Sequence, residues 1–288
     1  MNLCQPETVR ALLSRHGFRF SKTLGQNFII DSEVPLAMAV ICGADRTSGV
    51  LEIGPGIGSL TRELCRVAGK VVSIELDRAL YPILGETMAE HSNFHLIEGD
   101  VMDCNISELV REEFAGLSPL VCANLPYHIT SPVLTALIRA KCFSSITVLV
   151  QNEVADRIVA APGTAEYGAF SVFMQFYTTP EKCFTVPASS FMPPPKVTSA
   201  VLHCPVRSSP CVKVADEAHF HRTVRAAFAL RRKTLVNSLQ TGFGSLTKRQ
   251  LSEALRLVGL PDSTRGERLS LAEFASLSNT LFEMEKSL

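Results

Sequence analysis

The sequence contains no Trp, and aromatic residues make up only 7% of its 288 positions. Apolar residues still account for 46% of the chain, so Leu, Val, Ile and Ala must fill most of its core. No run approaches the roughly 18 consecutive apolar residues of a membrane-spanning helix, and residues 1–10 contain no apolar leader segment. We therefore expect a cytoplasmic protein without a membrane anchor, built from one large domain or two unequal ones.

The sequence also lacks the cysteine spacing of a metal or redox motif. No two of its nine cysteines stand in a C-x-x-C arrangement. We therefore predict no metal site and expect reduced cysteines that pack as small apolar side chains.

The net charge is zero, but the charges are segregated along the chain. Residues 31–120 hold 6 Lys and Arg against 15 Asp and Glu, whereas residues 182–256 hold 12 against 3. A basic segment of this kind favours an anionic partner such as nucleic acid, although an ordinary solvated face is an equal alternative. Candidate phosphate contacts are Lys196, Arg222, Arg225, Arg231, Arg232 and Lys233. Arg222 and Arg225 would share one face of a helix.

The first two thirds of the chain alternate between short β-rich runs and helical patterns, which builds a doubly wound, mostly parallel sheet. We expect a helix over residues 59–68 with Ser59 as its N-cap, and a helix cap at Asp77. The expected strands are residues 49–53, 70–75, 94–98, 120–123 and 146–150.

The pattern changes near residues 184–210, where six prolines bracket one further strand-like run at residues 197–203. Beyond Pro210 the pattern is helical, with helices expected at residues 217–230, 234–240, 247–258 and 269–284. We therefore predict an α/β domain over residues 1–205 and a small all-helical domain over residues 206–288.

Residues 52–58 (EIGPGIG) place a glycine loop between a strand and a helix. Glycines let the backbone turn sharply and approach a ligand closely. The spacing differs from the G-x-G-x-x-G that cradles a pyrophosphate, and an acid directly before the loop would repel that group. Glu52, Gly54 and Gly56 therefore indicate a site for an amino-acid or cationic ligand such as S-adenosylmethionine.

Two further acids follow later strands. Glu75 ends the second strand, where a carboxylate can accept both ribose hydroxyls of a nucleoside, and Asp100 ends the third, where it can meet an adenine amine. Each acid alone could be a helix cap or a surface charge, but in register with the glycine loop they favour a nucleotide cofactor. A dehydrogenase is the competing class at this point.

Asn124, Leu125, Pro126 and Tyr127 follow the fourth strand and favour a methyltransferase. The amine of adenine is a poor nucleophile, and an Asn side-chain oxygen together with the Leu125 carbonyl can accept its two hydrogens. Pro126 restricts the direction of that carbonyl, and Tyr127 offers a flat face for an extruded base. The alternative is a turn that only joins a strand to a helix.

Together these motifs resemble those of the bacterial small-subunit (16S) rRNA adenine N6,N6-dimethyltransferase family, over nearly the whole chain. Further matching segments are residues 23–28 (TLGQNF), 151–157 (QNEVADR), 167–168 (YG), 191–197 (FMPPPKV) and 231–235 (RRKTL). The resemblance implies a Rossmann-like class I methyltransferase domain with S-adenosylmethionine contacts at Asn27, Ile29, Gly54, Glu75, Asp100 and Asn124. It also implies that Phe191 stacks on the target adenine opposite Tyr127.

The resemblance further implies an enzyme that dimethylates two adjacent adenines in a loop near the 3′ end of 16S rRNA, within the assembling 30S subunit. We expect it to act as a monomer. Two positions depart from the family pattern: Asn152 stands where the family usually has Lys, which removes a positive charge, and Ile29 replaces the usual Leu.

Two other functions compete with this one. The related 23S rRNA methyltransferase of macrolide resistance shares the glycine loop and a similar Asn-x-Pro-Tyr motif, but the G-P-G loop, Leu125 and the P-P-P-K-V run favour the small-subunit enzyme. The second is an RNA-binding assembly factor whose methylation is secondary, and the intact set of catalytic groups offers it no support.

Overall fold

The computed structural model describes residues 1–21 and 24–287. They form two compact units, residues 1–155 with 181–206 and residues 156–180 with 207–288. The division after residue 206 lies beside the predicted boundary. Residues 156–180, which the prediction assigns to the first domain, cluster instead with the C-terminal residues.

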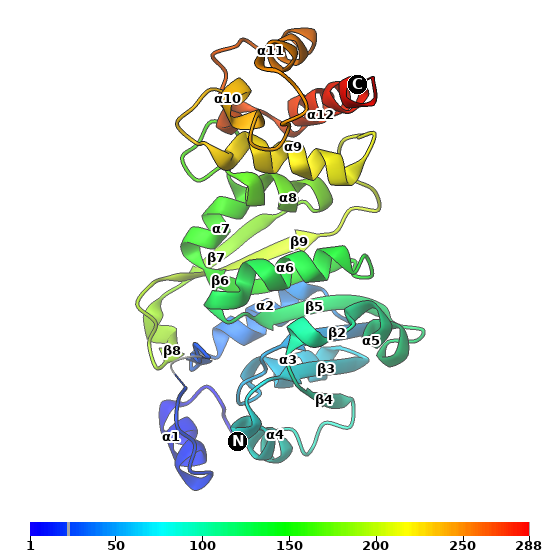
Figure 1. The fold of residues 1–288 in the computed structure, drawn as a ribbon. Coiled ribbons are helices and arrows are strands. Elements are labelled where there is room, and N and C mark those ends of the chain that lie inside the picture. The colour runs from blue at the N-terminus through cyan, green and yellow to red at the C-terminus, as the bar shows by residue number, and fades with distance from the viewer. Residues whose placement is uncertain (22–23, 288) are drawn as a thin grey trace. The chain divides into compact units, whose positions relative to one another are not determined.

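The first unit is built on a seven-stranded sheet, whose strand order is β4-β3-β2-β5-β6-β9-β7 (Figure 1). The first five strands in this order run parallel, whereas β9 and β7 are antiparallel to their neighbours. The predicted Rossmann-like, doubly wound sheet is therefore confirmed. The strands are β2 (Ser48–Ile53), β3 (Lys70–Glu75), β4 (Phe94–Glu98), β5 (Ser118–Asn124), β6 (Ser145–Gln151), β7 (Glu181–Val186) and β9 (Ser199–Pro205).

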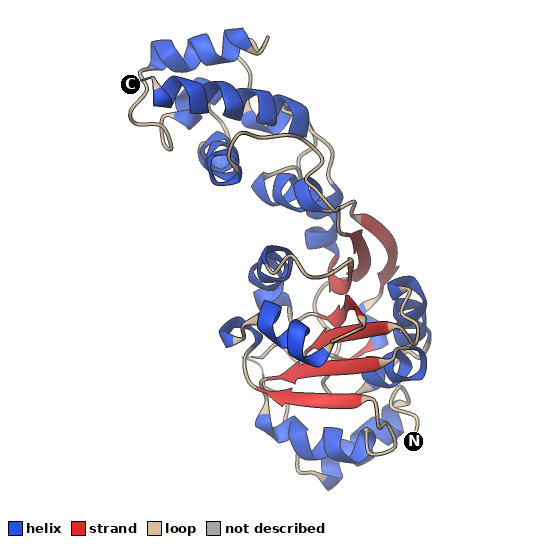
Figure 2. Cartoon of the chain, turned by 90° about the vertical axis from the view of Figure 1, so that its right-hand side faces the viewer, coloured by secondary structure: helices blue, strands red, loops and turns tan. Residues whose placement is uncertain are grey.

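Both faces of the sheet are covered by helices (Figure 2). On β2, the adjacent residues Val50 and Leu51 point to opposite faces, yet neither is exposed to solvent, and the same holds for Val71 and Val72 on β3. Continuous burial of this kind explains why these strands are apolar runs rather than alternating patterns. The helices of this unit are α1 (Pro6–Arg15), α2 (Glu33–Cys42), α3 (Ser59–Val67), α4 (Tyr81–Thr87), α5 (Ile106–Glu113) and α6 (Thr130–Arg139).

Two local predictions about helix caps have different outcomes. The Asp77 side chain accepts a hydrogen bond from the Ala79 amide at 3.0 Å and caps a short 3₁₀ turn, as predicted. Ser59 is not the N-cap of α3, because Gly58 takes that position in a left-handed conformation (φ +90°). The Ser59 hydroxyl instead donates to the Leu3 carbonyl at 3.2 Å, a bond to a residue 56 positions away.

The order of the strands creates a switch point between β2 and β5. From β2 the chain continues outward to β3 and β4, whereas β5 leads in the opposite direction to β6. Loops that leave neighbouring strands in opposite directions open a crevice at the carboxyl ends of those strands, where open α/β sheets bind ligands. The loop after β2 carries the glycines and the loop after β5 carries Asn124–Tyr127.

A two-stranded antiparallel sheet joins β1 (Phe28–Ile29) to β8 (Phe191–Met192), with Ile29 opposite Phe191. This pairing, which the sequence did not predict, connects the N-terminal segment to the proline-rich segment before β9.

The regular elements of the second unit are helices, as predicted for the C-terminal part. Its core contains Tyr167, Phe176, Phe220 and Phe274, all under 2% exposed. Its helices are α8 (Ala169–Tyr177), α9 (Glu217–Ala229), α10 (Leu235–Leu239), α11 (Lys248–Leu257) and α12 (Leu271–Lys286), and α7 (Asn152–Val159) contributes its C-terminal residues. No helix among the described residues is long and apolar enough to cross a bilayer.

Candidate active site

One pocket, of about 1090 Å³ with its open mouth, lies at the switch point of the sheet. It gathers residues from five separate segments of the first unit. All predicted cofactor contacts line it, namely Asn27, Ile29, Glu52, Gly54, Gly56, Glu75, Asp100 and Asn124, together with Leu125, Pro126 and Tyr127. Phe191 is the one predicted site residue that does not line this pocket.

The glycine loop is built from left-handed residues, with φ values of +69° at Gly54, +61° at Gly56 and +90° at Gly58. L side chains rarely adopt this conformation. A Cβ atom on Gly56 would also stand only 3.1 Å from the ring of Phe28. The loop therefore needs glycine both for its turn and for its close packing against the N-terminal segment.

The glycine loop and the segment after β5 lie against each other. A Cβ built on Gly54 would be 3.8 Å from the Cδ atom of Pro126, which is ordinary van der Waals contact. A ligand held over the glycine turn therefore lies next to Asn124 and Leu125, which share the pocket. This proximity would allow a group to pass from a ligand on the glycine loop to a second ligand beside Asn124 and Leu125.

Glu75 ends β3 as a buried acceptor, 6% exposed. Its two carboxylate oxygens accept hydrogen bonds from the amides of Asp77 at 2.8 Å and Gly56 at 3.3 Å. Burial raises the pKa of Glu75, and these amide hydrogen bonds partly lower it. The two amides fix both oxygens at the pocket wall, where each keeps capacity to accept from a ligand hydroxyl.

Glu52 is more deeply buried, at 1% exposed. One of its oxygens, Oε2, accepts from the hydroxyls of Thr61 at 2.7 Å and Ser73 at 2.6 Å. Burial raises the pKa of Glu52 to about 7, although those two hydrogen bonds lower it. Glu52 thus connects the end of β2 to α3 and β3 beneath the glycine loop while it also lines the pocket.

The residues after β5 are held individually. The Asn124 side-chain amide donates to the Asn27 carbonyl at 3.2 Å, and the Leu125 amide donates to the Leu149 carbonyl at 3.1 Å. The Tyr127 hydroxyl is 2.7 Å from the Ser199 hydroxyl, and burial raises the pKa of Tyr127. Asp100 accepts from the Met102 amide at 2.9 Å at the end of β4.

Phe191 does not occupy the place predicted for it. Its side chain is 2% exposed and belongs to the apolar core of the first unit. Pairing of β8 with β1 puts Phe191 opposite Ile29, which lines the pocket, whereas Phe191 does not. In this structure the ring presents no free face on which a base could stack.

Several pocket residues were not predicted from the sequence. Gln26 lies inside the recognised segment TLGQNF, but no role follows from its type alone; Thr23 of that segment lies outside the described residues. His128 and Leu76 also line the pocket. Leu76 is 49% exposed, and its place as an apolar residue between Glu75 and Asp77 at the end of an expected strand is a sequence signal that could have identified it.

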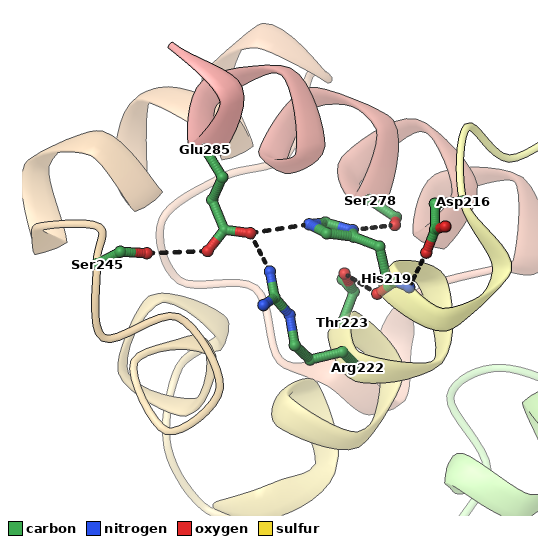
Figure 3. A network of polar contacts seen from close by, with 7 residues as sticks. All are labelled: Asp216, His219, Arg222, Thr223, Ser245, Ser278 and Glu285. Atoms are coloured by element: carbon green, nitrogen blue, oxygen red, sulfur yellow. Dashed lines mark hydrogen bonds and ion pairs between the residues drawn. The ribbon is translucent and has the colours of Figure 1, made fainter. Parts of the chain in front are cut away.

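Two of the predicted phosphate contacts in the second unit, Arg222 and Arg225, differ in their surroundings. Arg222 pairs with Glu285 of α12 (Figure 3). Its guanidinium also lies 4.3 Å from the centroid of the Phe243 ring. Arg225 is exposed. The two arginines therefore do not form one free basic face, because Arg222 is committed to an internal ion pair.

Metal ligands do not gather in the part of the chain that the structure describes, where no group of three His, Cys, Asp or Glu side chains could hold an ion. Asn152, the departure from the family pattern, donates its backbone amide to the Thr198 carbonyl at 2.9 Å and does not line the pocket.

Comparison with known proteins gives consistent matches over the full length. A family model described as ribosomal RNA adenine dimethylase matches residues 17–283. Proteins named ribosomal RNA small subunit methyltransferase A are 43% identical in Geobacillus thermodenitrificans, over 98% of both chains, and 41% identical in Listeria welshimeri, over 97% of both.

Solved structures share the fold. A 23S rRNA methyltransferase, ErmE, has a TM-score of 0.68 and 25% identity over 89% of this chain and 100% of its own. A dimethyladenosine transferase from Plasmodium falciparum has a TM-score of 0.74 and 23% identity over 90% of this chain and 97% of its own.

Proposed function

Because this chain belongs to the ribosomal RNA adenine dimethylase family, we propose that it dimethylates two adjacent adenines in a loop near the 3′ end of 16S rRNA. S-adenosylmethionine is the cofactor of the family. The substrate is the assembling 30S subunit, and the protein acts on it as a monomer in the cytoplasm. The observation that carries the proposal is that the cofactor loop and the base-binding segment line one pocket, with Gly54 close to Pro126.

The pocket fits the cofactor. Its left-handed glycine turn leaves room for a ligand against the backbone, and Glu75 is a buried acceptor already aligned by two amides. Glu75 would hold the ribose hydroxyls, and Asp100 would accept from the adenine amine. Glu52 adds a second buried carboxyl that suits a cationic ligand. When bound, S-adenosylmethionine supplies an electrophilic methyl group.

The residues after β5 prepare the target amine. Asn124 Oδ1 and the Leu125 carbonyl would accept its two hydrogens and draw the nitrogen toward a tetrahedral geometry. Pro126 fixes the direction of the Leu125 carbonyl, and the bond to Ser199 holds the Tyr127 ring for stacking with the base. No strong general base is needed, because the nitrogen loses its proton only after it has become cationic. Positioning of this kind can supply roughly 7–11 kcal/mol of the barrier.

The decisive experiment uses small subunits from a strain that lacks this methylation. Incubation with the protein and S-adenosylmethionine should produce N6,N6-dimethyladenosine in digested 16S rRNA, detected by mass spectrometry of nucleosides. Large subunits from the same cells are the control, since the ErmE likeness at 25% identity makes 23S rRNA the competing substrate. Dimethyladenosine on the large subunit alone would reject the 16S assignment.

A further inference from the structure

A short stretch of the N-terminal segment, residues 24–29, forms one wall of the pocket, and we name it the strap. All six residues of the strap line the pocket. Besides the pairing of Phe28 and Ile29 with β8, two hydrogen bonds attach the strap, one to the loop after β3 and one to the end of β5. One attachment is a side chain, Gln26, and the other is a backbone carbonyl, that of Asn27.

The first attachment uses both ends of the Gln26 amide. Its Nε2 donates to Asp77 Oδ2 at 2.6 Å, and its Oε1 accepts from the Ser21 amide at 2.9 Å. The other oxygen of Asp77, Oδ1, accepts from the Ala79 amide. Because each of these atoms has a hydrogen-bond partner, neither the Gln26 amide nor the Asp77 carboxylate can rotate by 180° without loss of a hydrogen bond. Gln26 therefore joins the strap to the loop after β3 in one defined orientation.

The second attachment reaches the catalytic segment. Asn124 Nδ2 donates to the Asn27 carbonyl at 3.2 Å, while Asn27 Nδ2 donates to the Gly25 carbonyl at 3.0 Å. An Asn side chain has one donor end and one acceptor end. Since the strap takes the donor end of Asn124, the acceptor end, Oδ1, remains for the pocket, and this is the end that must accept from an adenine amine.

We infer that Gln26 is a positioning residue for methyl transfer: through Asp77 it holds the strap so that the Asn27 carbonyl selects the reactive orientation of the Asn124 amide. The inference rests on the proposed function. It assigns to a residue that touches neither transferred methyl nor base a role in the rate of the reaction, separate from the affinity for the cofactor.

The test exchanges donor and acceptor across the Gln26–Asp77 bond. Gln26→Glu puts two carboxylates face to face, which breaks the bond at almost constant size. Asp77→Asn added to it restores the bond in reverse: its oxygen still caps Ala79 while its amide donates to the new carboxylate. Gln5→Glu is the matched control, the same change at an exposed position of the N-terminal region.

We expect Gln26→Glu to slow single-turnover methylation of undermethylated small subunits by about 10-fold to 100-fold at saturating cofactor, since small displacements of a reacting group cost rates of this order. Cofactor affinity, measured with S-adenosylhomocysteine by calorimetry, should change less than about threefold, well below the loss in rate. The Gln26→Glu/Asp77→Asn protein should recover most of the rate, and Gln5→Glu should match the wild type.

A readout independent of activity is the ¹⁵N signal of the Asn124 side-chain amide, assigned by its loss in Asn124→Ala. Its hydrogen exchange should be slow in the wild type, faster in Gln26→Glu and slow again in the double variant. An unchanged rate in Gln26→Glu, no recovery in the double variant, a loss confined to cofactor affinity, or an unaltered Asn124 signal would each overturn the inference. A wild-type protein that methylates no small subunits rejects the proposed function instead, and the Asn124 signal still decides the role of the strap.

Discussion

Asn124 combines two tasks in one side chain, because the Asn27 carbonyl takes its donor end and leaves its acceptor end for the pocket that Asn124 lines. The buried Leu125 has no polar side chain, so in the proposed mechanism it contributes only its backbone carbonyl as a second acceptor. The neighbouring residues of the segment contribute by holding this arrangement in place.

Replacement of Asn124 by Ala should therefore abolish transfer without loss of the fold. We expect the rate at saturating cofactor to fall by at least about 10²-fold, as when a single preorganised oxyanion donor or acceptor is removed. Binding of small subunits should persist, measured by sedimentation. Near-normal turnover in this variant would remove Asn124 from the mechanism and favour an assembly factor with incidental activity.

Glu52 makes a separate prediction about pH. Its pKa is raised from an ordinary value of 4.5 to about 7 by burial. The stability that this group contributes is therefore fully present below pH 4.5 and is lost as the pH rises through 7. The glutamine of Glu52→Gln does not titrate. As the pH rises over this range, the free energy of unfolding of the variant should therefore increase relative to that of the wild type, by on the order of 3 kcal/mol.

Denaturant unfolding of cofactor-free protein at pH 5 and pH 8 measures the gain. Glu112→Gln, at an exposed position of α5, is the control and should leave the difference between the two pH values unchanged. A variant that loses stability relative to the wild type at the higher pH would contradict the sign of this prediction.

At the scale of elements, α12 is joined to α9 by a cluster of polar side chains. Glu285 of α12 faces Arg222 and His219 of α9, and its other oxygen accepts from the Ser245 hydroxyl at 2.9 Å (Figure 3). The other ring nitrogen of His219 is 2.9 Å from the hydroxyl of Ser278, which precedes Glu285 on α12. The cluster fixes the register of these two helices.

Glu285→Gln should destabilise the protein by about 1–3 kcal/mol at pH 7, since it weakens charge-assisted hydrogen bonds to a carboxylate whose side chain is only 22% exposed. Burial alone would raise the pKa of Glu285, but the hydrogen bonds from Ser245 and Arg222 and the charge of Arg222 bring it below its ordinary value. The stabilisation is present above pH 4.5 and is lost as the pH falls through the lowered pKa.

Thermal unfolding at pH 7 and pH 3.5 would show whether the cost of Glu285→Gln shrinks in acid. Glu283→Gln is a control on the same helix: its ion pair with Lys286 is 68% exposed on the glutamate side and should contribute less than about 1 kcal/mol. Equal losses of stability in the two variants would show that the cluster stabilises the protein no more than an exposed ion pair does.

At the scale of the whole molecule, the helical unit draws part of its core from residues 156–180. Tyr167, Val172 and Phe176 are each at most 1% exposed within it. The Tyr167 hydroxyl donates to the Leu269 carbonyl at 2.9 Å. A C-terminal fragment that begins at the boundary predicted from the sequence would lack these three core side chains.

We therefore predict that residues 207–288 alone do not unfold cooperatively, because loss of three buried side chains removes roughly 1.5–3 kcal/mol each. Residues 156–180 joined to residues 207–288 by a short glycine linker should fold, since the Arg207 amide already lies 2.9 Å from the Tyr177 carbonyl. Circular dichroism melts of the two fragments give the comparison. A cooperative melt of residues 207–288 by themselves would restore the simple division at residue 206.

The local elements of this protein are determined by its sequence alone. The strands β2, β3 and β4 and the helices α9 to α12 begin and end within a few residues of their predicted bounds. Periodicity, caps and glycine turns depend on neighbours a few residues away, so they can be predicted from the sequence. The motifs of the pocket could be identified for the same reason.

Only the tertiary structure decided which distant groups meet. The antiparallel β7 beside β9, the pairing of Phe191 with Ile29, the ion pair of Arg222 with Glu285 and the bond of Ser59 to Leu3 join residues that no local pattern relates. The reversal of strand order between β2 and β5 belongs to the same class, and it brings the glycine loop to Pro126. Such choices depend on the packing of whole faces against one another, a free energy shared among many residues and assigned to none of them in the sequence.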